Sequence, residues 1–229
     1  MCSRYFLDAD GNVISFTFHV PVHDRVRKRF NLAPTQEAPV VRAAGAGGRE
    51  IAMLRWGLVP FWAKDLSIGN RMINARSETV GEKPSFRNAF RARRCLVPAT
   101  GFYEWTGEAG HKVPHAITFA DQPVFAFAGL WESWRDKSNP DAPAVETYTL
   151  LTTDANRALS AIHDRMPVIL RPEDHEAWLS APPAQAAKLL RPYADEPTRS
   201  RIVSRLVNNP RNESPDVLKQ AEPVGSDPA

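Results

Sequence analysis

Four short stretches of the sequence place polar side chains inside otherwise apolar surroundings. They are MCSRY, MINARSET, GFYEW and AIHDRMPVIL, and they contribute Cys2, Asn74, Glu104 and His163. A polar group in such a setting must face solvent, find a partner or line a site. A thiol, an amide, a carboxylate and an imidazole together supply a nucleophile, acid–base groups and an orienting group.

Cys2 directly follows the initiator methionine. A small side chain at position 2 allows Met1 to be removed, which leaves an α-amine and a thiol on the same residue. Such an aminothiol is a chemical reagent, and the rest of the chain decides whether it is used as one.

Each of the other three residues also has a structural interpretation. Strand alternation puts Glu104 on the same face as Phe102, between the bulky Tyr103 and Trp105 on the opposite face. Aromatic surroundings raise the pKa of a carboxyl and make acid–base catalysis possible, but a surface glutamate on an edge strand fits the same pattern.

His163 could equally complement the end of a helix, and Asn74 could cap the next helix. For Cys95, in RRCLVPATGFYEW, core packing is the better interpretation.

The segment RWGLVPFWAKD carries Trp56, Phe61 and Trp62 close to basic residues such as Arg76. A cluster of this kind is either core or, where exposed, a stacking platform for unpaired bases. The basic residues comprise 22 Arg and 7 Lys. This preference for arginine suits a protein that binds phosphate groups, but GC-rich codon usage produces the same preference. No recognition helix or zinc finger is evident.

The composition is that of an ordinary globular protein, with 43% hydrophobic residues and a net charge of +3 over 229 residues. No apolar run is long enough to span a membrane, and the N-terminus lacks a signal peptide, so we expect a cytoplasmic protein that does not bind membranes. Two cysteines cannot form a disulfide framework, and no Cys/His spacing suggests zinc, so we expect no metal and no cofactor.

β-branched and aromatic content predicts many strands with irregularly placed helices between them. This pattern favours a single α+β domain around a largely antiparallel, curled sheet, spanning residues 2–215 and followed by a polar, flexible tail at 216–229. The predicted strands are 2–7, 39–43, 51–58, 95–105, 113–119, 124–131, 147–152, 167–170 and 202–207, and the predicted helices are 23–30, 85–93, 156–162 (after a cap at Asp154), 172–180 and 184–190.

Taken in order, these motifs resemble the SRAP (SOS-response-associated peptidase) family of abasic-site processing proteins. MCSRY, RFNLAPTQEAPVVR, RWGLVPFW, INARSET, RRCLVPATGFYEW, IHDRMPVIL and VSRLVNN follow one another across residues 2–210. One departure is Ser3, where the family usually has glycine. The added Cβ is expected to narrow the approach to Cys2 without changing its chemistry. The resemblance implies the family's barrel-like α+β fold.

The resemblance also implies a function. Family members trap abasic sites in single-stranded DNA as a covalent thiazolidine crosslink, with Cys2 as the nucleophile and Asn74, Glu104 and His163 around it. The residues expected to contact DNA are Arg4, Arg76 and Arg165, with Trp62 from the aromatic cluster and Asn31 and Pro34 from the RFNLAPT segment. The expected partner is single-stranded DNA containing abasic sites, bound by a monomer.

Two alternatives remain open at this stage. The chain could be a Cys/His thiol peptidase, whose action includes removal of its own Met1. It could also be a single-strand binding module without catalysis. Crosslinking needs both the free α-amine and the thiol, whereas a thiol peptidase needs only the thiol.

Overall fold

The computed structural model describes residues 2–108, 110–139 and 141–221. Its centre is a closed five-stranded barrel in which each strand pairs with the next in the order β10-β4-β3-β6-β9 and β9 pairs back to β10. The β4–β10 pair is parallel and the other pairs are antiparallel. The barrel strands are β3 (Glu37–Ala43), β4 (Arg49–Trp56), β6 (Arg94–Ala99), β9 (Phe125–Trp134) and β10 (Val145–Asp154).

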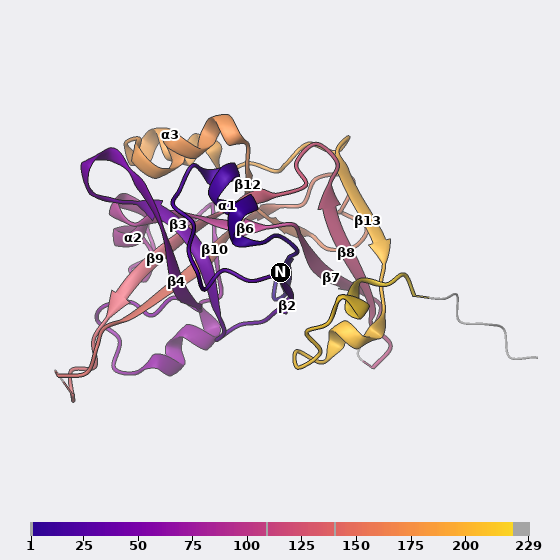
Figure 1. The fold of residues 1–229 in the computed structure, drawn as a ribbon, viewed down its shortest axis with the longest axis horizontal. Helices are drawn as coiled ribbons and strands as arrows, with labels where there is room; N and C mark the ends of the chain where they lie inside the picture. The colour runs from indigo at the N-terminus through magenta and orange to yellow at the C-terminus, as the bar shows by residue number, and fades with distance from the viewer. Residues whose placement is uncertain (1, 109, 140, 222–229) are drawn as a thin grey trace, which may run out of the picture.

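A second sheet lies beside the barrel, on the right in Figure 1. All its neighbouring strands are antiparallel, in the order β13-β8-β7-β1-β2. Its strands are β1 (Tyr5–Leu7), β2 (Arg29–Leu32), β7 (Gly101–Thr106), β8 (Val113–Phe119) and β13 (Thr198–Ile202). The two sheets are consecutive in the chain at β6 and β7, so the polypeptide passes from barrel to second sheet at Thr100.

Two short strands flank the second half of β10. β5 (Asn74–Arg76) runs parallel to it along Leu150–Thr152, and β11 (Arg165–Pro167) runs antiparallel along Thr152–Asp154. A third short strand, β12 (Ile169–Leu170), pairs with β9. β10 therefore holds the segments that carry Asn74 and His163 on its two sides.

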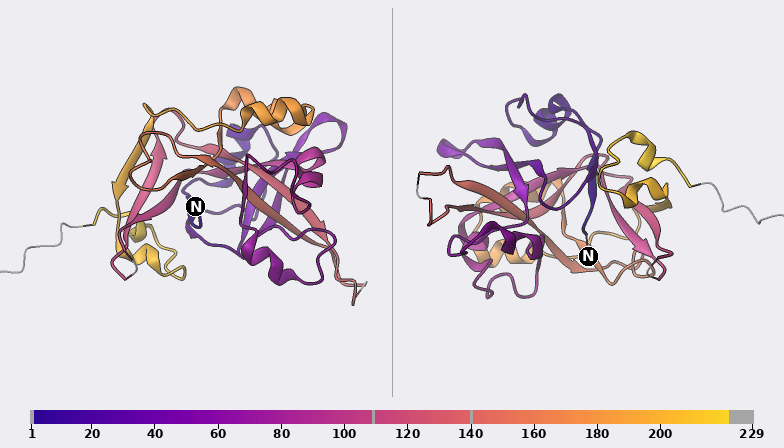
Figure 2. Two further views of the ribbon diagram at one scale, coloured as in Figure 1. Left: turned by 180° about the vertical axis from the view of Figure 1, so that it is seen from behind. Right: turned by 90° about the horizontal axis from the view of Figure 1, so that it is seen from below.

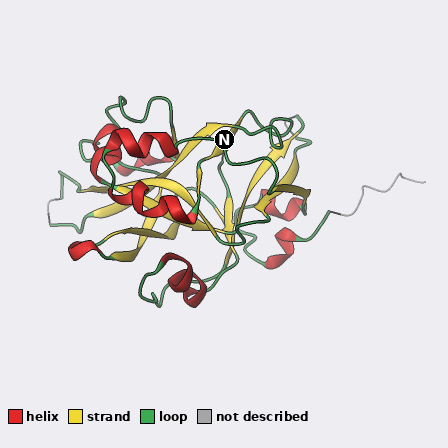
Figure 3. Cartoon of the chain, turned by 90° about the horizontal axis from the view of Figure 1, so that it is seen from above, coloured by secondary structure: helices red, strands yellow, loops and turns green. Residues whose placement is uncertain are grey.

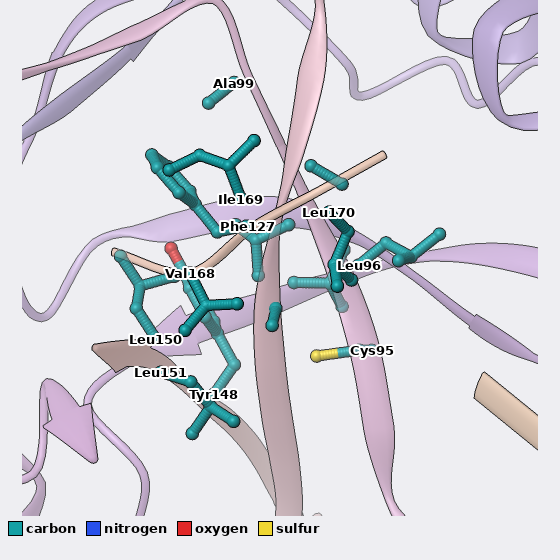
Figure 4. Packing of buried hydrophobic residues seen from close by; sticks show 14 of the residues in the cluster. Cys95, Leu96, Ala99, Phe127, Tyr148, Leu150, Leu151, Val168, Ile169 and Leu170 are labelled. Atoms are coloured by element: carbon teal, nitrogen blue, oxygen red, sulfur yellow. The ribbon is translucent and has the colours of Figure 1, made fainter. Parts of the chain in front are cut away.

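Every barrel strand contributes buried apolar side chains to the main core cluster. Figure 4 shows part of this cluster, including side chains of β6, β9 and β10. Phe127, Tyr148 and Leu150 are fully buried there. Cys95 is also fully buried in this cluster, which confirms its predicted place in the core. Residues 125–130 of β9 are buried on both faces of the strand, which explains the nearly continuous apolar run of FAFAGL.

Short helices lie around the outside of the strands (Figures 2 and 3). The longest described helix begins after Asp10, whose carboxylate accepts hydrogen bonds from the backbone N–H groups of Asn12 and Val13. The α-helices are α1 (Gly11–Phe18), α2 (Arg87–Ala92), α3 (His175–Ser180) and α4 (Pro183–Ala186). The 3-10 helices are η1 (Gly45–Gly47), η2 (Leu66–Arg71), η3 (Pro172–Asp174), η4 (Ala187–Leu189), η5 (Arg205–Asn208) and η6 (Pro215–Leu218). The predicted α+β fold with a barrel-like sheet is confirmed.

Two predicted helices are wrong. Residues 23–30 form a turn that leads into β2, because Arg29–Leu32 pairs with β1. Residues 156–162 form successive turns, and Asp154 ends β10 rather than capping a helix. Asn156 makes the first turn instead: its Oδ1 accepts from Leu159 N–H, and its Nδ2 donates to Thr198 Oγ1.

Several predicted strand boundaries are also wrong. The single strand expected at 95–105 is two strands, β6 and β7, in different sheets. The strand expected at 167–170 is likewise divided, with β11 on β10 and β12 on β9. Of the strand expected at 202–207, only Ile202 is in β13, and Arg205–Asn208 is the 3-10 helix η5. The helix α1 and the strands β2 and β5 were not predicted.

The structured chain continues beyond residue 215, where we expected the domain to end. η6 (Pro215–Leu218) buries Val217 completely, against Val203 and Val207. Residues 222–229 of the expected tail lie outside the described residues. The described part of the chain has no helix both long enough and apolar enough to cross a membrane.

Candidate functional site

Cys2 lies three residues before the start of β1, and its side chain is fully buried. The Asn74 side chain donates a hydrogen bond from Nδ2 to the Cys2 carbonyl oxygen at 2.7 Å. Asn74 is the first residue of β5 and is followed by turns, so it does not cap a helix. Its Oδ1 is buried and has no hydrogen-bond partner among the described residues. This acceptor beside Cys2 is available to a substrate. Met1 itself, whose removal was expected, lies outside the described residues.

The Cys2 thiol is held in its protonated form. Burial raises its pKa above the ordinary value, and the neighbouring Glu104 carboxylate raises it further. The Sγ atom lies 3.6 Å from the Arg4 carbonyl oxygen, to which the S–H can donate. A thiol in this environment does not wait as a thiolate and must give up its proton as it attacks.

Glu104 projects from β7 on the side of the main core. Phe102 packs in the main cluster, whereas Tyr103 and Trp105 belong to the smaller cluster on the other face, as strand alternation predicted. Only 6% of Glu104 is exposed. Burial raises the pKa of its carboxyl, and the nearby His163, when its ring is protonated, opposes that rise. Glu104 is not the surface glutamate of the alternative interpretation.

His163 lies two residues before the start of β11 and is half-buried. Its Nδ1 accepts a hydrogen bond from the Arg165 backbone N–H at 2.9 Å. The same Nδ1 lies 2.7 Å from Asp164 Oδ1, and this contact becomes an ion pair only when the ring is protonated. A hydrogen bond joins Asn74 to Cys2. Electrostatic interactions link the Cys2 thiol to the Glu104 carboxyl, and that carboxyl to His163. The structure thus gathers all four residues where β1 and β7 of the second sheet meet β5 and β11.

A cavity of about 400 Å³ opens beside this cluster and is here called the basic pocket. Its cations are Arg4, Lys112 and Arg205, and none of the residues that line it is acidic. The indole of Trp105 forms one wall, with the Arg4 guanidinium 5.9 Å from its ring centre. The lining residues are Ser3, Arg4, Trp105, Gly110, Lys112, Arg205 and Asn208.

Hydrogen bonds fix the walls of the basic pocket in place. Arg4 Nη1 donates to Asn31 Oδ1 at 2.7 Å and to the Val207 carbonyl at 2.9 Å. Trp105 Nε1 donates to Asn208 Oδ1 at 2.7 Å. A cation and an indole held in this way are suited to one phosphate and one stacked base.

The structure places Asn31 in the interior rather than at the surface. It is fully buried, and its Nδ2 donates to the carbonyls of Val207, Asn209 and Asn212. Asn31 therefore connects β2 to the η5 segment and supports Arg4. Pro34 is half-buried in the connection between β2 and β3.

The remaining expected DNA contacts differ in accessibility. Arg76 is exposed at the end of β5. Trp62 is 41% exposed, whereas Trp56 is buried and donates through Nε1 to the Ile73 carbonyl. The aromatic cluster is thus divided between core and surface. The Arg165 side chain is mostly buried, and its guanidinium forms ion pairs with Glu78 and Asp154.

Sequence reasoning missed the residues that complete the basic pocket. Lys112 and Arg205 come from a hairpin loop and a 3-10 helix, and nothing in their local sequence distinguishes them from other surface cations. Trp105 was considered only as a neighbour of Glu104. In the described part of the chain, no cluster of three or more His, Cys, Asp or Glu side chains could hold a metal ion.

Comparisons with known proteins identify the family of the chain and relatives of its fold. The family model described as SOS response associated peptidase (SRAP) matches residues 1–210. The Bacillus subtilis abasic site processing protein YoqW is 39% identical over 96% of this chain and 99% of its own length. The Xenopus tropicalis abasic site processing protein HMCES is 30% identical over 85% of this chain and 67% of its own length. A crystal structure of a Bacteroides thetaiotaomicron protein, 28% identical, covers 96% of this chain and the whole of that one with a TM-score of 0.86.

Proposed function

Because the chain belongs to the SOS-response-associated peptidase family, we propose that it processes abasic sites in single-stranded DNA by covalent attachment through Cys2. Similar proteins from a bacterium and a vertebrate are named abasic site processing proteins. The observation that carries the proposal is the convergence of Cys2, Asn74 and Glu104 beside a basic pocket. The proposed substrate places the protein on damaged DNA.

The proposed chemistry uses both reactive groups of Cys2 once Met1 has been removed. An abasic deoxyribose equilibrates with a ring-opened aldehyde. The α-amine, whose reference pKa of about 7.7–8.0 leaves part of it neutral, attacks the aldehyde carbon, and loss of water gives an imine. The thiol sulfur then adds to the imine carbon while its proton passes to the nitrogen. This closes a five-membered thiazolidine, and the second step is favoured because it is intramolecular.

The buried polar groups have matching roles in this proposal. Glu104, whose pKa is raised by burial, can donate a proton to the sugar ring oxygen and can then accept one from the amine or thiol. His163 serves proton transfer around the imine. The Asn74 Oδ1 acceptor lies beside Cys2 and can orient the sugar or the imine N–H.

The state of the thiol supports crosslinking over peptide hydrolysis. A thiol peptidase relies on a thiolate stabilised by a neighbouring imidazolium. Here burial and Glu104 both raise the pKa of Cys2. A neutral thiol is adequate for the second step of thiazolidine formation, in which the imine is already electrophilic and the two groups share one residue.

We place the DNA strand across the basic pocket and toward Arg76 and Trp62. Arg4, Lys112 and Arg205 would hold phosphates, and Trp105 and Trp62 would stack on bases. The exposed position of Arg76, two residues after Asn74, would set a phosphate close to the reacting sugar.

The test is intact mass after incubation with a single-stranded oligonucleotide carrying one abasic site. The expected product has the mass of the protein without Met1 plus the oligonucleotide, less one water. Cys2→Ala should bind the strand without stable attachment, and Cys2→Ser should give at most a labile imine. A heat-stable adduct at wild-type yield in either variant would exclude the thiazolidine. Cleavage of peptides without any DNA adduct would favour the peptidase alternative. Tight binding of the strand without crosslinking or peptide cleavage would favour a binding module.

A further inference from the structure

Ser3 lies between two residues whose backbone positions are fixed by hydrogen bonds. On one side, the Cys2 carbonyl oxygen accepts from Asn74 Nδ2 at 2.7 Å. On the other side, the Arg4 carbonyl oxygen accepts from the Tyr103 backbone N–H at 3.0 Å. The backbone at Ser3 is therefore held in place before a DNA strand arrives, which lowers the cost of using its side chain in binding.

The surroundings of Ser3 favour a negatively charged ligand. Ser3 is half-buried and lines the basic pocket together with the cations of Arg4, Lys112 and Arg205. None of the described residues that line this pocket is acidic. Three positive charges around one cavity attract phosphate groups, so a polar side chain in the same wall meets phosphate oxygens.

The Ser3 hydroxyl is available to such a ligand. Within the part of the chain that the structure describes, it makes no hydrogen bond to any other residue. A hydroxyl carries one donor and can rotate it toward an acceptor. A phosphate oxygen in the basic pocket would supply that acceptor.

The proposed attachment at Cys2 determines which phosphate comes close to Ser3. The Cα atoms of adjacent residues lie about 3.8 Å apart, so Ser3 is next to anything that is bonded to Cys2. An abasic sugar carries a phosphate on each side. The 3′ phosphate is connected to the aldehyde carbon through fewer bonds than the 5′ phosphate, so it stays nearer to the point of attachment.

We infer that Ser3 is a substrate-binding residue whose hydroxyl donates a hydrogen bond to the phosphate on the 3′ side of the abasic sugar. The inference rests on the proposed function, because reaction at Cys2 is what brings this phosphate beside Ser3. The contact would hold the damaged nucleotide against the α-amine, while the cations of the basic pocket attract the strand as a whole.

A neutral donor and a cation leave different signatures in binding. A cation that binds a phosphate releases a counterion, so loss of that contact lowers the logarithmic salt slope by about 0.7. A serine hydroxyl releases no counterion. Its loss should therefore weaken binding by the same factor at every salt concentration, and a hydrogen bond to a charged group corresponds to about tenfold in affinity.

The experiment uses a short single strand in which a tetrahydrofuran residue replaces the abasic sugar. This analogue keeps both flanking phosphates but has no aldehyde, so binding is reversible and fluorescence anisotropy gives the affinity. All proteins are compared after intact mass has confirmed the loss of Met1. Ser3→Ala should bind about tenfold more weakly than the wild type, with an unchanged salt slope. Ser3→Thr keeps the hydroxyl and should bind nearly as tightly as the wild type.

Ser200→Ala is the matched control. It removes an exposed hydroxyl from β13, outside the basic pocket, and should bind the tetrahydrofuran strand as the wild type does.

Uncharged phosphate analogues identify the phosphate that Ser3 contacts. A methylphosphonate on the 3′ side of the tetrahydrofuran removes the charged acceptor, so wild type and Ser3→Ala should bind this strand with nearly equal affinity. With the methylphosphonate on the 5′ side, the tenfold difference between the two proteins should remain. The comparison is a double-mutant cycle between one side chain and one phosphate.

Three results would overturn the inference. They are equal affinities of wild type and Ser3→Ala for the tetrahydrofuran strand, a difference that survives the 3′ methylphosphonate, and a salt slope that falls in Ser3→Ala. Failure of the proposed function would be seen separately. The wild type would then bind the tetrahydrofuran strand but form no adduct with a strand that carries a true abasic site.

Discussion

At the scale of the residue, Glu104 shows how the fold prepares a group for proton transfer. A carboxyl that is 6% exposed is costly to ionise, so burial raises its pKa, and His163 limits the rise. The raised pKa makes the protonated form of this carboxyl easier to populate than that of an exposed glutamate, which favours a role in proton donation. The cost of holding it there is a loss of stability.

Glu104→Gln should slow crosslink formation by about 100-fold, the usual scale for loss of an acid–base group, with little change in binding to intact single strands. It should also stabilise the fold at neutral pH. Because the pKa of Glu104 is higher in the folded protein, the wild type loses stability as pH rises from the ordinary value of 4.5 through the folded value.

The check is thermal melting of both proteins at pH 4 and pH 7, with a time course of adduct on a denaturing gel. The melting temperature of Glu104→Gln should exceed that of the wild type at pH 7, and the difference should be small at pH 4. Equal adduct rates for the two proteins would remove Glu104 from the chemistry.

His163→Ala should slow crosslinking less than Glu104→Gln does. Its larger effect should be on strand cleavage or on reversal of the adduct, where a proton must return to a leaving group. The measurement follows formation and release separately, after transfer of the purified adduct to excess unmodified competitor strand. Formation and release both at wild-type rates would show that His163 is structural.

At the scale of the element, the basic pocket is built from pieces that are short and far apart. The start of the chain, the β7–β8 hairpin and η5 each contribute residues to it. Asn31 joins β2 to η5, so a single amide supports both Arg4 and the opposite wall. The amide was expected to contact DNA directly, and its burial indicates an indirect contribution.

Lys112→Ala and Arg205→Ala should each weaken single-strand binding and lower the logarithmic salt slope by about 0.7, the share of one phosphate. Lys188→Ala, in η4 and outside the pocket, is the matched control and should have no effect. Fluorescence anisotropy of an unmodified strand at several salt concentrations gives both quantities. A logarithmic salt slope that stays at the wild-type value in both pocket variants would show that the DNA strand binds outside the basic pocket.

The helix α3 carries a second titratable group that affects stability. His175 is 4% exposed and stacks on Phe18 with ring centres 5.4 Å apart. Burial, with a contribution from Arg49, lowers its pKa from the ordinary 6.5 to about 4. Protonation therefore favours the unfolded chain. The contribution of neutral His175 to the free energy of unfolding is fully present above pH 6.5. It is lost, by about 3 kcal/mol in total, as the pH decreases toward 4.

His175→Phe keeps the stacking on Phe18 and removes the titration. Urea unfolding between pH 4 and pH 7 should give a flatter stability profile for the variant. Parallel profiles for the two proteins would show that His175 does not contribute to the acid sensitivity.

The elements that could be predicted from sequence are those with strong periodicity or strong caps. The β-branched runs of β3, β8 and β10 and the proline-led start of η3 and α3 fall within a few residues of the expected ranges. β5 could not be foreseen, because three residues carry no periodicity and its pairing with β10 is set by the tertiary fold. The same holds for the division at Thr100, where a largely apolar segment changes sheets with only Thr100 and Gly101 to mark the place.

At the scale of the whole molecule, the barrel and the second sheet provide different functions. The barrel is a closed, apolar scaffold, and the four candidate catalytic residues lie where the second sheet meets the strands that flank β10. The motifs identified these four residues because each stands in a distinctive local sequence. The pocket cations could not be identified in this way, because their role depends on distances between remote segments of the chain.

The hydrogen bond from Arg4 to the Val207 carbonyl joins residues 203 positions apart. Cys2, Asn74, Glu104 and His163 are all synthesised before that partner exists. A product of premature termination upstream of η5 would carry the reactive groups but lack one side of the pocket that we propose holds the strand. On that proposal, incomplete translation products would form covalent adducts with DNA inefficiently. Efficient trapping of abasic sites would require translation to continue through the C-terminal segment.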